Sequence, residues 1–244
     1  MKEATALALN ALNQLFYTDS AALFDETRRA PWPGWREILP LFRERPVATI
    51  LDVGCGNGRL ARFLTTELGA PFLYFGIDAS APLLSAAANA VEGLTGARLL
   101  RGDLVLEPPE RVLPDGPFDC VVAFGLLHHI PGEARRRALI RALARRVAPG
   151  GILALAFWDF AGEPRFAAKA LSGALLAEVA DDLEPGDHLL RWGAEGSVRL
   201  RYCHHADEAE QTRLLAGLPL QPRLSFASDG RSGRLNRYRV LERR

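Results

Sequence analysis

The chain has 244 residues, of which 48% are hydrophobic and 24% charged, an ordinary composition for a globular protein long enough to bury a full core. Its formal net charge of +1 excludes a protein drawn to nucleic acid or an anionic membrane by its overall field. Three widely separated cysteines, the lack of an apolar run of about 20 residues and the lack of a signal-peptide cleavage site predict a soluble cytoplasmic protein without disulfides or a membrane span.

Helix-like and strand-like segments alternate along most of the chain. Residues 1–45 have a helical pattern that is broken by the two prolines of APWPGW, and we expect them to form an N-terminal helical cap. Apolar runs predict strands at 47–53, 72–78, 97–103, 118–127 and 150–160. Helical spacing predicts helices at 59–68, 81–91 and 132–147, near 163–180 and near 206–216.

Two more strands are predicted at the C-terminal end, at about 219–227 and 235–242. The short connection SDGRSG between them favours an antiparallel hairpin. The order of elements predicts an α/β fold with a doubly wound, mostly parallel seven-stranded sheet and helices on both faces. We expect a single domain over 1–244, made of the cap (1–45), a ligand-binding core (46–160) and a substrate-side region with the hairpin (161–244).

The segment ILDVGCGNG, residues 50–58, lies at the carboxyl end of the first predicted strand, where such sheets bind ligands. Gly54, Gly56 and Gly58 occupy alternate positions directly after Asp52 and Val53. Glycines there permit a tight turn and a close approach of the ligand to the backbone. A dinucleotide site would read G-x-G-x-x-G, with the third glycine one position later, so the loop favours another ligand.

This loop and the ends of the following strands resemble the class I (Rossmann-like) S-adenosylmethionine-dependent methyltransferases over residues 47–157. The resemblance implies S-adenosylmethionine as cofactor. In that class Asp52 would help hold the ammonium side of the cofactor, Asp78 would accept hydrogen bonds from both ribose hydroxyls, and Asp103 would face the adenine amino group. The alternative for any single acid is a helix cap. The implied cofactor residues are Asp52, Gly54, Gly56, Gly58, Asp78, Gly102, Asp103 and Phe124.

Segments outside this core resemble the tRNA wobble-uridine methyltransferases, which esterify the carboxylate of 5-carboxymethyluridine. LFDETRRAPWP (23–33) is similar to the T-R-x-x-P-W-P segment of that family. The weaker matches are GLLHHI (125–130), LAFWDF (155–160), RYCHH (201–205) and LNRYRVL (235–241). The resemblance implies tRNA as a partner. Because eukaryotic members work with a small activating protein subunit, it also allows such a partner here.

Arg28 is a candidate to bind a carboxylate, either that of the substrate or that of the cofactor, and an ion pair with Asp25 or Glu26 is the alternative. The family matches imply that a base pocket is lined by His128, Trp158, Tyr202, His204 and Arg237. Packing roles are the alternative for His128 and Trp158. No metal site is predicted, because neighbouring residues of CHH (203–205) would point to opposite faces of an extended chain.

A carboxylate acceptor is ionised at neutral pH and needs no strong general base, so alignment would supply most of the catalysis. Arginines of the helix 132–147 and of the tail from Arg223 to Arg244 could follow a tRNA backbone, or they could form solvated faces. The sequence therefore predicts a methyltransferase for a tRNA wobble uridine. Two alternatives stay open: a small-molecule O- or N-methyltransferase, and a catalytically silent cofactor-binding module that binds RNA or activates a partner.

Overall fold

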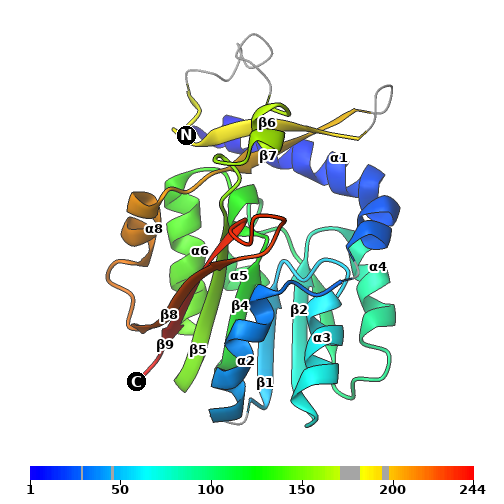
Figure 1. The fold of residues 1–244 in the computed structure, drawn as a ribbon, viewed down its shortest axis with the longest axis vertical. Coiled ribbons are helices and arrows are strands. Elements are labelled where there is room, and N and C mark those ends of the chain that lie inside the picture. Colours follow the sequence, from blue (N-terminus) through cyan, green and yellow to red (C-terminus); the bar gives the residue numbers. More distant parts are fainter. Residues whose placement is uncertain (29, 45–46, 171–181, 194–197) are drawn as a thin grey trace.

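The computed structural model describes residues 1–28, 30–44, 47–170, 182–193 and 198–244. A seven-stranded sheet with the order β3-β2-β1-β4-β5-β9-β8 forms its centre (Figure 1). The strands are β1 (Thr49–Val53), β2 (Leu73–Asp78), β3 (Arg98–Arg101), β4 (Phe118–Phe124), β5 (Val147–Trp158), β8 (Gln221–Ser228) and β9 (Asn236–Glu242). Strands β1 to β5 pair in parallel, whereas β9 is antiparallel to β5 and β8 is antiparallel to β9. The predicted mostly parallel sheet and its C-terminal hairpin are confirmed.

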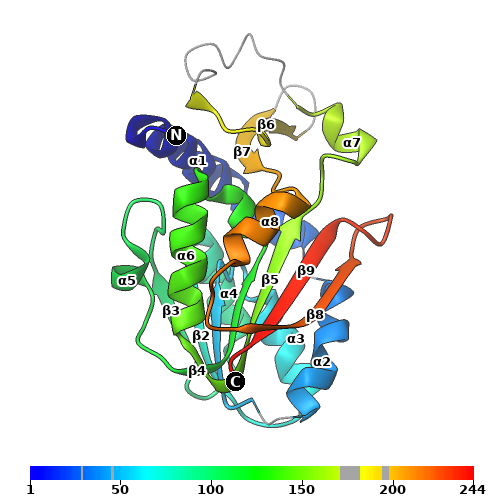
Figure 2. The ribbon, with the colours of Figure 1, turned by 90° about the vertical axis from the view of Figure 1, so that its left-hand side faces the viewer.

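Helices cover both faces of this sheet, as predicted (Figure 2). Alternate residues of the central strands explain the two layers. Leu51 and Val121 join the core under α6 (Glu133–Arg145) and α8 (Glu208–Leu215). Ile50 and Val122 join the core under α2 (Gly34–Glu44) and α3 (Arg59–Leu68). Strands buried on both faces need a near-continuous apolar run, which is why the sequence pattern identified them. Helix α4 (Ala81–Ala90) follows β2.

A second layer lies across the carboxyl ends of the parallel strands (Figure 1). It consists of α1 (Glu3–Thr27) and an antiparallel two-stranded ribbon of β6 (Asp187–Trp192) and β7 (Arg199–His204). The backbone N–H of Tyr202 donates to Asn13 Oδ1 at 2.8 Å, which fixes β7 against α1. The ribbon was not predicted from the sequence.

Several element boundaries differ from the prediction. The fourth strand ends at Phe124, because Gly125 turns the chain with a φ of 75° and a 3-10 turn, η1 (Leu127–His129), follows. A one-turn helix, α5 (Pro109–Val112), lies between β3 and β4. The predicted helix near 163–180 is only α7 (Pro164–Ala167) in the described part, and its remainder, 171–181, lies outside the described residues. Within the described ranges, none of the helices has the length and apolar character of a membrane span.

Candidate active site

A cavity of about 770 Å³ lies at the carboxyl ends of the parallel strands, beneath α1 and β7. Its volume is in the usual range of small-molecule sites, and its place is where doubly wound sheets bind ligands. Carboxylates and glycines from the ends of β1, β2 and β3 line one side. Basic and aromatic side chains from α1, β5 and β7 line the other. The cavity therefore has two chemically different halves, called here the acidic half and the basic half.

The glycine loop turns sharply between β1 and α3 in the acidic half. Gly54, Gly56 and Gly58 have φ values of 78°, 54° and 72°, a region that side chains with a Cβ avoid. A Cβ on Gly54 would lie 2.9 Å from Leu126 Cβ, and one on Gly58 would lie 2.9 Å from Ala90 Cβ. A Cβ on Gly56 would meet nothing within 4 Å. Gly54 and Gly56 line the cavity, whereas Gly58 allows α3 and α4 to pack closely.

Two carboxyl groups support this loop, of which Asp52 is buried and Asp78 is half-buried. Asp78 accepts hydrogen bonds from the backbone N–H groups of Gly56 and Ser80, both at 2.9 Å. Asp52 accepts one from the Tyr74 hydroxyl at 2.6 Å. Burial raises the pKa of Asp52 to about 7, although the Tyr74 hydrogen bond lowers it. Burial likewise raises the pKa of Asp78. A cationic ligand group would stabilise the ionised form of Asp52.

Asp103 connects β3 to the N-terminal helix. Its Oδ1 accepts the backbone N–H groups of Val105 at 2.9 Å and Leu106 at 3.2 Å. Its Oδ2 accepts the side-chain amides of Asn10 at 2.8 Å and Gln14 at 3.0 Å. The predicted contact between Asp103 and an adenine amino group would have to share Oδ2 with these amides. Asn10 and Gln14 were not singled out from the sequence, because helical periodicity does not reveal that they meet a distant acid.

The acidic half fits S-adenosylmethionine in three respects. The open space above Gly56 admits a ligand against the loop backbone. The partly accessible Asp78 carboxylate suits hydroxyl donors, and buried Asp52 suits an ammonium group. Gly102 and Phe124, the other predicted cofactor residues, also line the cavity. Of the predicted cofactor residues, only Gly58 does not.

An aromatic wall closes the cavity where β4 and β5 end. The ring of His128 lies 4.9 Å from Trp158 and 4.1 Å from His129, and its buried Nδ1 has no hydrogen-bond partner. His129 Nε2 lies 2.7 Å from Tyr17 Oη, and its Nδ1 lies 3.0 Å from the Tyr202 carbonyl oxygen. Burial lowers the pKa of His128 well below its usual value and that of His129 to about 3. Both rings are therefore neutral at pH 7.

Arg201 of β7 forms part of the basic half. Only 7% of the residue is exposed, and its Nε has no hydrogen-bond partner. Its guanidinium carbon lies 4.9 Å from the centroid of the Trp158 ring and 5.4 Å from that of Phe16. No described carboxylate forms an ion pair with it. Arg201 was not singled out from the sequence, although it begins the RYCHH segment.

Arg28, the predicted carboxylate ligand, lines the cavity at the end of α1. Its guanidinium carbon lies 4.3 Å from the Phe24 ring centroid, and its Nη1 donates to Thr27 Oγ1 at 3.2 Å. The alternative ion pair with Asp25 or Glu26 is not formed among the described residues. Burial lowers the pKa of Arg28, and the neighbouring charge of Arg201 lowers it further.

Three predicted acceptor residues do not reach the cavity. Tyr202 and His204 are buried on the other side of β7, because neighbouring residues of a strand face opposite ways and Arg201 takes the cavity side. Arg237 pairs with Asp159 at 2.8 Å beside the cavity rather than in its lining. These three residues are thus corrected from acceptor-binding to structural positions, while Arg28, His128 and Trp158 remain candidates.

Tyr202 and His204 belong to a buried polar cluster around Arg136 of α6, called here the Arg136 network. Its members are Arg136, Glu184, Asp187, Tyr202, His204 and Glu210. Arg136 donates to Glu210 at 3.0 Å and to Glu184 at 2.7 Å. His204 bonds Asp187 and Glu210, each at 2.7 Å. The network connects α6, α8 and the β6–β7 ribbon.

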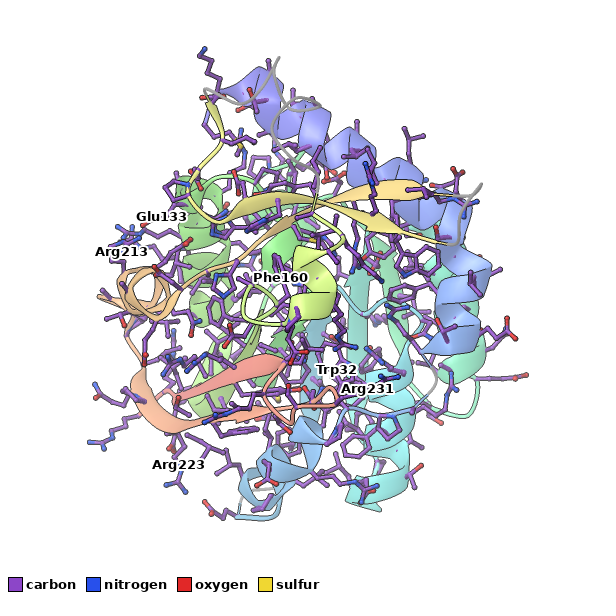
Figure 3. All side chains as sticks on the ribbon, turned by 45° about the horizontal axis from the view of Figure 1, so that its top comes forward. Trp32, Glu133, Phe160, Arg213, Arg223 and Arg231 are labelled. Atoms are coloured by element: carbon purple, nitrogen blue, oxygen red, sulfur yellow. The ribbon has the colours of Figure 1, made fainter. Side chains whose placement is uncertain are left out.

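The arginines expected to follow an RNA backbone are mostly engaged within the protein. Along α6, Arg135 pairs with Glu3 and Arg145 pairs with Glu110. In the C-terminal hairpin, Arg223, labelled in Figure 3, pairs with Glu44 at 2.6 Å and does not line the cavity. Exposed basic side chains line the mouth of the cavity instead, among them Arg231, which is labelled in Figure 3 together with Trp32, another lining residue. These rim residues are Arg165, Lys169, Arg191 and Arg231.

Comparisons with known proteins agree with this geometry. The family described as "Methyltransferase domain" matches residues 50–151. A protein of Encephalitozoon cuniculi named as a methyltransferase is 31% identical over 189 residues, which cover 78% of this chain and 77% of that protein. The tRNA (carboxymethyluridine(34)-5-O)-methyltransferase of Arabidopsis thaliana is 31% identical over 142 residues, which cover 58% of this chain but only 31% of the plant protein.

The fold is similar to that of solved methyltransferases. An S-adenosylmethionine-dependent methyltransferase of Clostridium acetobutylicum superposes with a TM-score of 0.66 at 16% identity, covering 93% of this chain and 98% of the other. This likeness supports the fold, while the methyltransferase relatives and the glycine loop support the activity and the donor. The chain belongs to the class I S-adenosylmethionine-dependent methyltransferases, and S-adenosylmethionine is its cofactor.

Proposed function

We propose that this methyltransferase esterifies a carboxylate on a modified wobble uridine of tRNA. The observation that carries the proposal is Arg201 in the basic half of the cavity, which is buried and has no acidic partner among the described residues. Buried cations are unfavourable without counter-charges, so this half suits an anionic acceptor. The similarity to the Arabidopsis carboxymethyluridine methyltransferase supports the same chemistry.

When bound, the donor supplies an electrophilic methyl group on a sulfonium sulfur. The residues of the chain then have to hold an acceptor oxygen in line with that methyl group, and alignment of this kind can account for most of the rate enhancement. A carboxylate is already ionised at neutral pH and gives up no proton, so no strong base is needed. Neutral His128 fits this requirement, because its unpartnered Nδ1 can hydrogen-bond the acceptor without removing a proton.

The aromatic and basic residues of the cavity suit a base that is turned out of an RNA strand. Trp158 presents an indole ring beside His128, and stacking on aromatic rings is a common way to hold an extruded base. The rim residues carry four exposed positive charges around the opening. They could contact the phosphates on either side of the methylated nucleotide.

A transfer assay with donor labelled on its methyl group tests the proposal. The substrates are two synthetic anticodon stem-loops that differ only in carrying 5-carboxymethyluridine or uridine at the wobble position. We expect label only in the carboxymethylated RNA, and we expect mild alkali to release it as methanol, because the product is an ester. Alkali-stable label, or label confined to a small-molecule extract, would contradict the proposal. Label that appears only after a protein extract is added would indicate the activating subunit that the family resemblance allows.

A further inference from the structure

Among the described arginines that line the cavity, only Arg201 is buried, and its guanidinium meets aromatic rings and no carboxylate. Phe16 and Trp158 lie 5.4 Å and 4.9 Å from its central carbon. Among the described residues it forms neither an ion pair nor a hydrogen bond through its side chain, and its buried Nε is unpartnered. A buried charge is tolerated when it is paired, so a group from outside the described chain should complete this site.

The surroundings leave the guanidinium suited to one class of ligand. Aromatic rings interact with the face of a guanidinium, whereas its N–H donors point outward in its plane. Planar donors in this fork match the two oxygens of a carboxylate. Because the residue lines the cavity, a carboxylate that enters from there can reach it.

Two other arginines, Arg28 and Arg59, lie beside the glycine loop and are better placed than Arg201 to bind the carboxylate of the donor. Asn57 of the glycine loop donates to the Arg28 carbonyl oxygen at 3.3 Å and to Asp25 at 2.8 Å, which ties the end of α1 to that loop. Arg59 is the first residue of α3, directly after the loop, and also lines the cavity. Arg28 and Arg59 are therefore on the donor side, while Arg201 lies on β7 against the aromatic wall where the acceptor is expected.

We propose that Arg201 is the anion subsite for the methyl acceptor and binds its carboxylate. The identity of that acceptor rests on the proposed function, but the choice of an anion rests on Arg201 itself. Esterification removes the negative charge of the acceptor. Arg201 therefore favours the substrate over the methylated product and promotes product release.

The test uses the protein saturated with S-adenosylhomocysteine and two nucleosides, 5-carboxymethyluridine and its uncharged amide, with calorimetry as the readout. We expect the wild-type protein to bind the acid about tenfold more tightly than the amide, the usual strength of a charge-assisted hydrogen bond. In Arg201→Gln the two dissociation constants should become equal. The matched control is Arg141→Gln, an exposed arginine of α6 without a partner among the described residues, which should keep the preference.

A second variant separates ligand binding from folding. Arg201→Met should bind S-adenosylhomocysteine as the wild type does, and its melting temperature should not fall, because the substitution removes an unpaired buried charge. A lower melting temperature would assign Arg201 to the fold and overturn the subsite. Weaker binding of S-adenosylhomocysteine in either variant would overturn it in favour of a donor contact.

The remaining outcomes distinguish this inference from the proposed function. An acid preference that is absent in the wild type, or that survives in Arg201→Gln, overturns the subsite even if tRNA is methylated. An acid preference that requires Arg201, in a protein that labels no tRNA, supports the subsite and contradicts the RNA substrate.

Discussion

Arg136 and Arg201 are both buried arginines, yet their surroundings are opposite. Arg136 is 1% exposed and donates to Glu184, Glu210 and the carbonyl oxygen of Ile130. Arg201 is 7% exposed and contacts aromatic rings without any acidic partner among the described residues. Strand β7 separates them, because Arg201 faces the cavity while Tyr202 and His204 face the Arg136 network.

The difference indicates which buried charges serve the fold and which serve a ligand. In the Arg136 network the counter-charges are built into the chain, so removal of one member leaves another charge buried and unpaired. At Arg201 no described residue supplies the counter-charge, so the positive charge is available to an anion that binds in the cavity. The same strand thus carries a structural ionic network on one face and a candidate ligand site on the other.

The largest expected effect is on stability, from Arg136→Met. This variant leaves buried Glu210 and half-buried Glu184 without their cation, and it should lower the free energy of unfolding by about 3–5 kcal/mol. Urea denaturation measures the change, and Arg201→Met, which should cause no loss, is the comparison. Equal losses in the two variants would remove the distinction between the two arginines.

A smaller effect in the same network should appear as a pH dependence of stability. Burial would lower the pKa of His204, but hydrogen bonds to Asp187 and Glu210 raise it above its usual value. Because folding raises the pKa of His204, protonation of its ring stabilises the folded state at pH values below the pKa in the unfolded chain. This stabilisation is lost as the pH rises through the pKa in the folded protein. The free energy of unfolding should therefore decline as the pH rises above about 6.5, the ordinary pKa of a histidine. His204→Asn should flatten that decline, and an unchanged profile would show that the ring is not charged in the folded protein.

Asp52 extends the comparison to a buried acid without an ion pair among the described residues. Because burial raises its pKa to about 7, a donor ammonium group should bind best when the carboxyl is ionised. Calorimetry with S-adenosylhomocysteine should show about tenfold tighter binding at pH 8 than at pH 6. Asp52→Asn should bind weakly at both values. Binding that does not change with pH in the wild type would argue against a contact between Asp52 and the ammonium group.

The smallest expected effect concerns exposed arginines. Arg231, a rim residue, should contribute about one ion to the salt dependence of anticodon stem-loop binding, so Arg231→Gln should reduce that slope by about one. Arg145→Gln, on α6, should leave it unchanged, because Arg145 already pairs with Glu110. Fluorescence anisotropy at several salt concentrations gives both slopes. A larger change in the slope for Arg145→Gln than for Arg231→Gln would instead indicate that the RNA binds along α6.

The sequence predicted the sheet and its glycine loop because their signals are local. A strand buried on both faces needs a continuous apolar run, and the loop after β1 needs glycines where φ is positive. The acids Asp52 and Asp78 followed from their places at strand ends. These features depend on a few consecutive residues and can be recognised without knowledge of the rest of the chain.

The basic half could not be predicted in the same way. The segment RYCHH was recognised, but a strand presents alternate residues to each face, and the face toward the cavity is set by packing against α1. Arg201 therefore reaches the cavity where Tyr202 and His204 were expected. The role of Arg136 in α6 could not be predicted locally either, because its partners Glu184 and Glu210 lie far from it along the chain.

The N-terminal helix has a mechanical consequence for the catalytic cycle. Through Asn10 and Gln14 it holds the carboxylate of Asp103 after β3, and through Asn13 and Tyr17 it holds β7 and His129. The same helix thus contacts both halves of the cavity. A displacement of α1 that disturbs one half would also disturb the other, so we expect exchange of the spent donor and release of the methylated product to be coupled through α1.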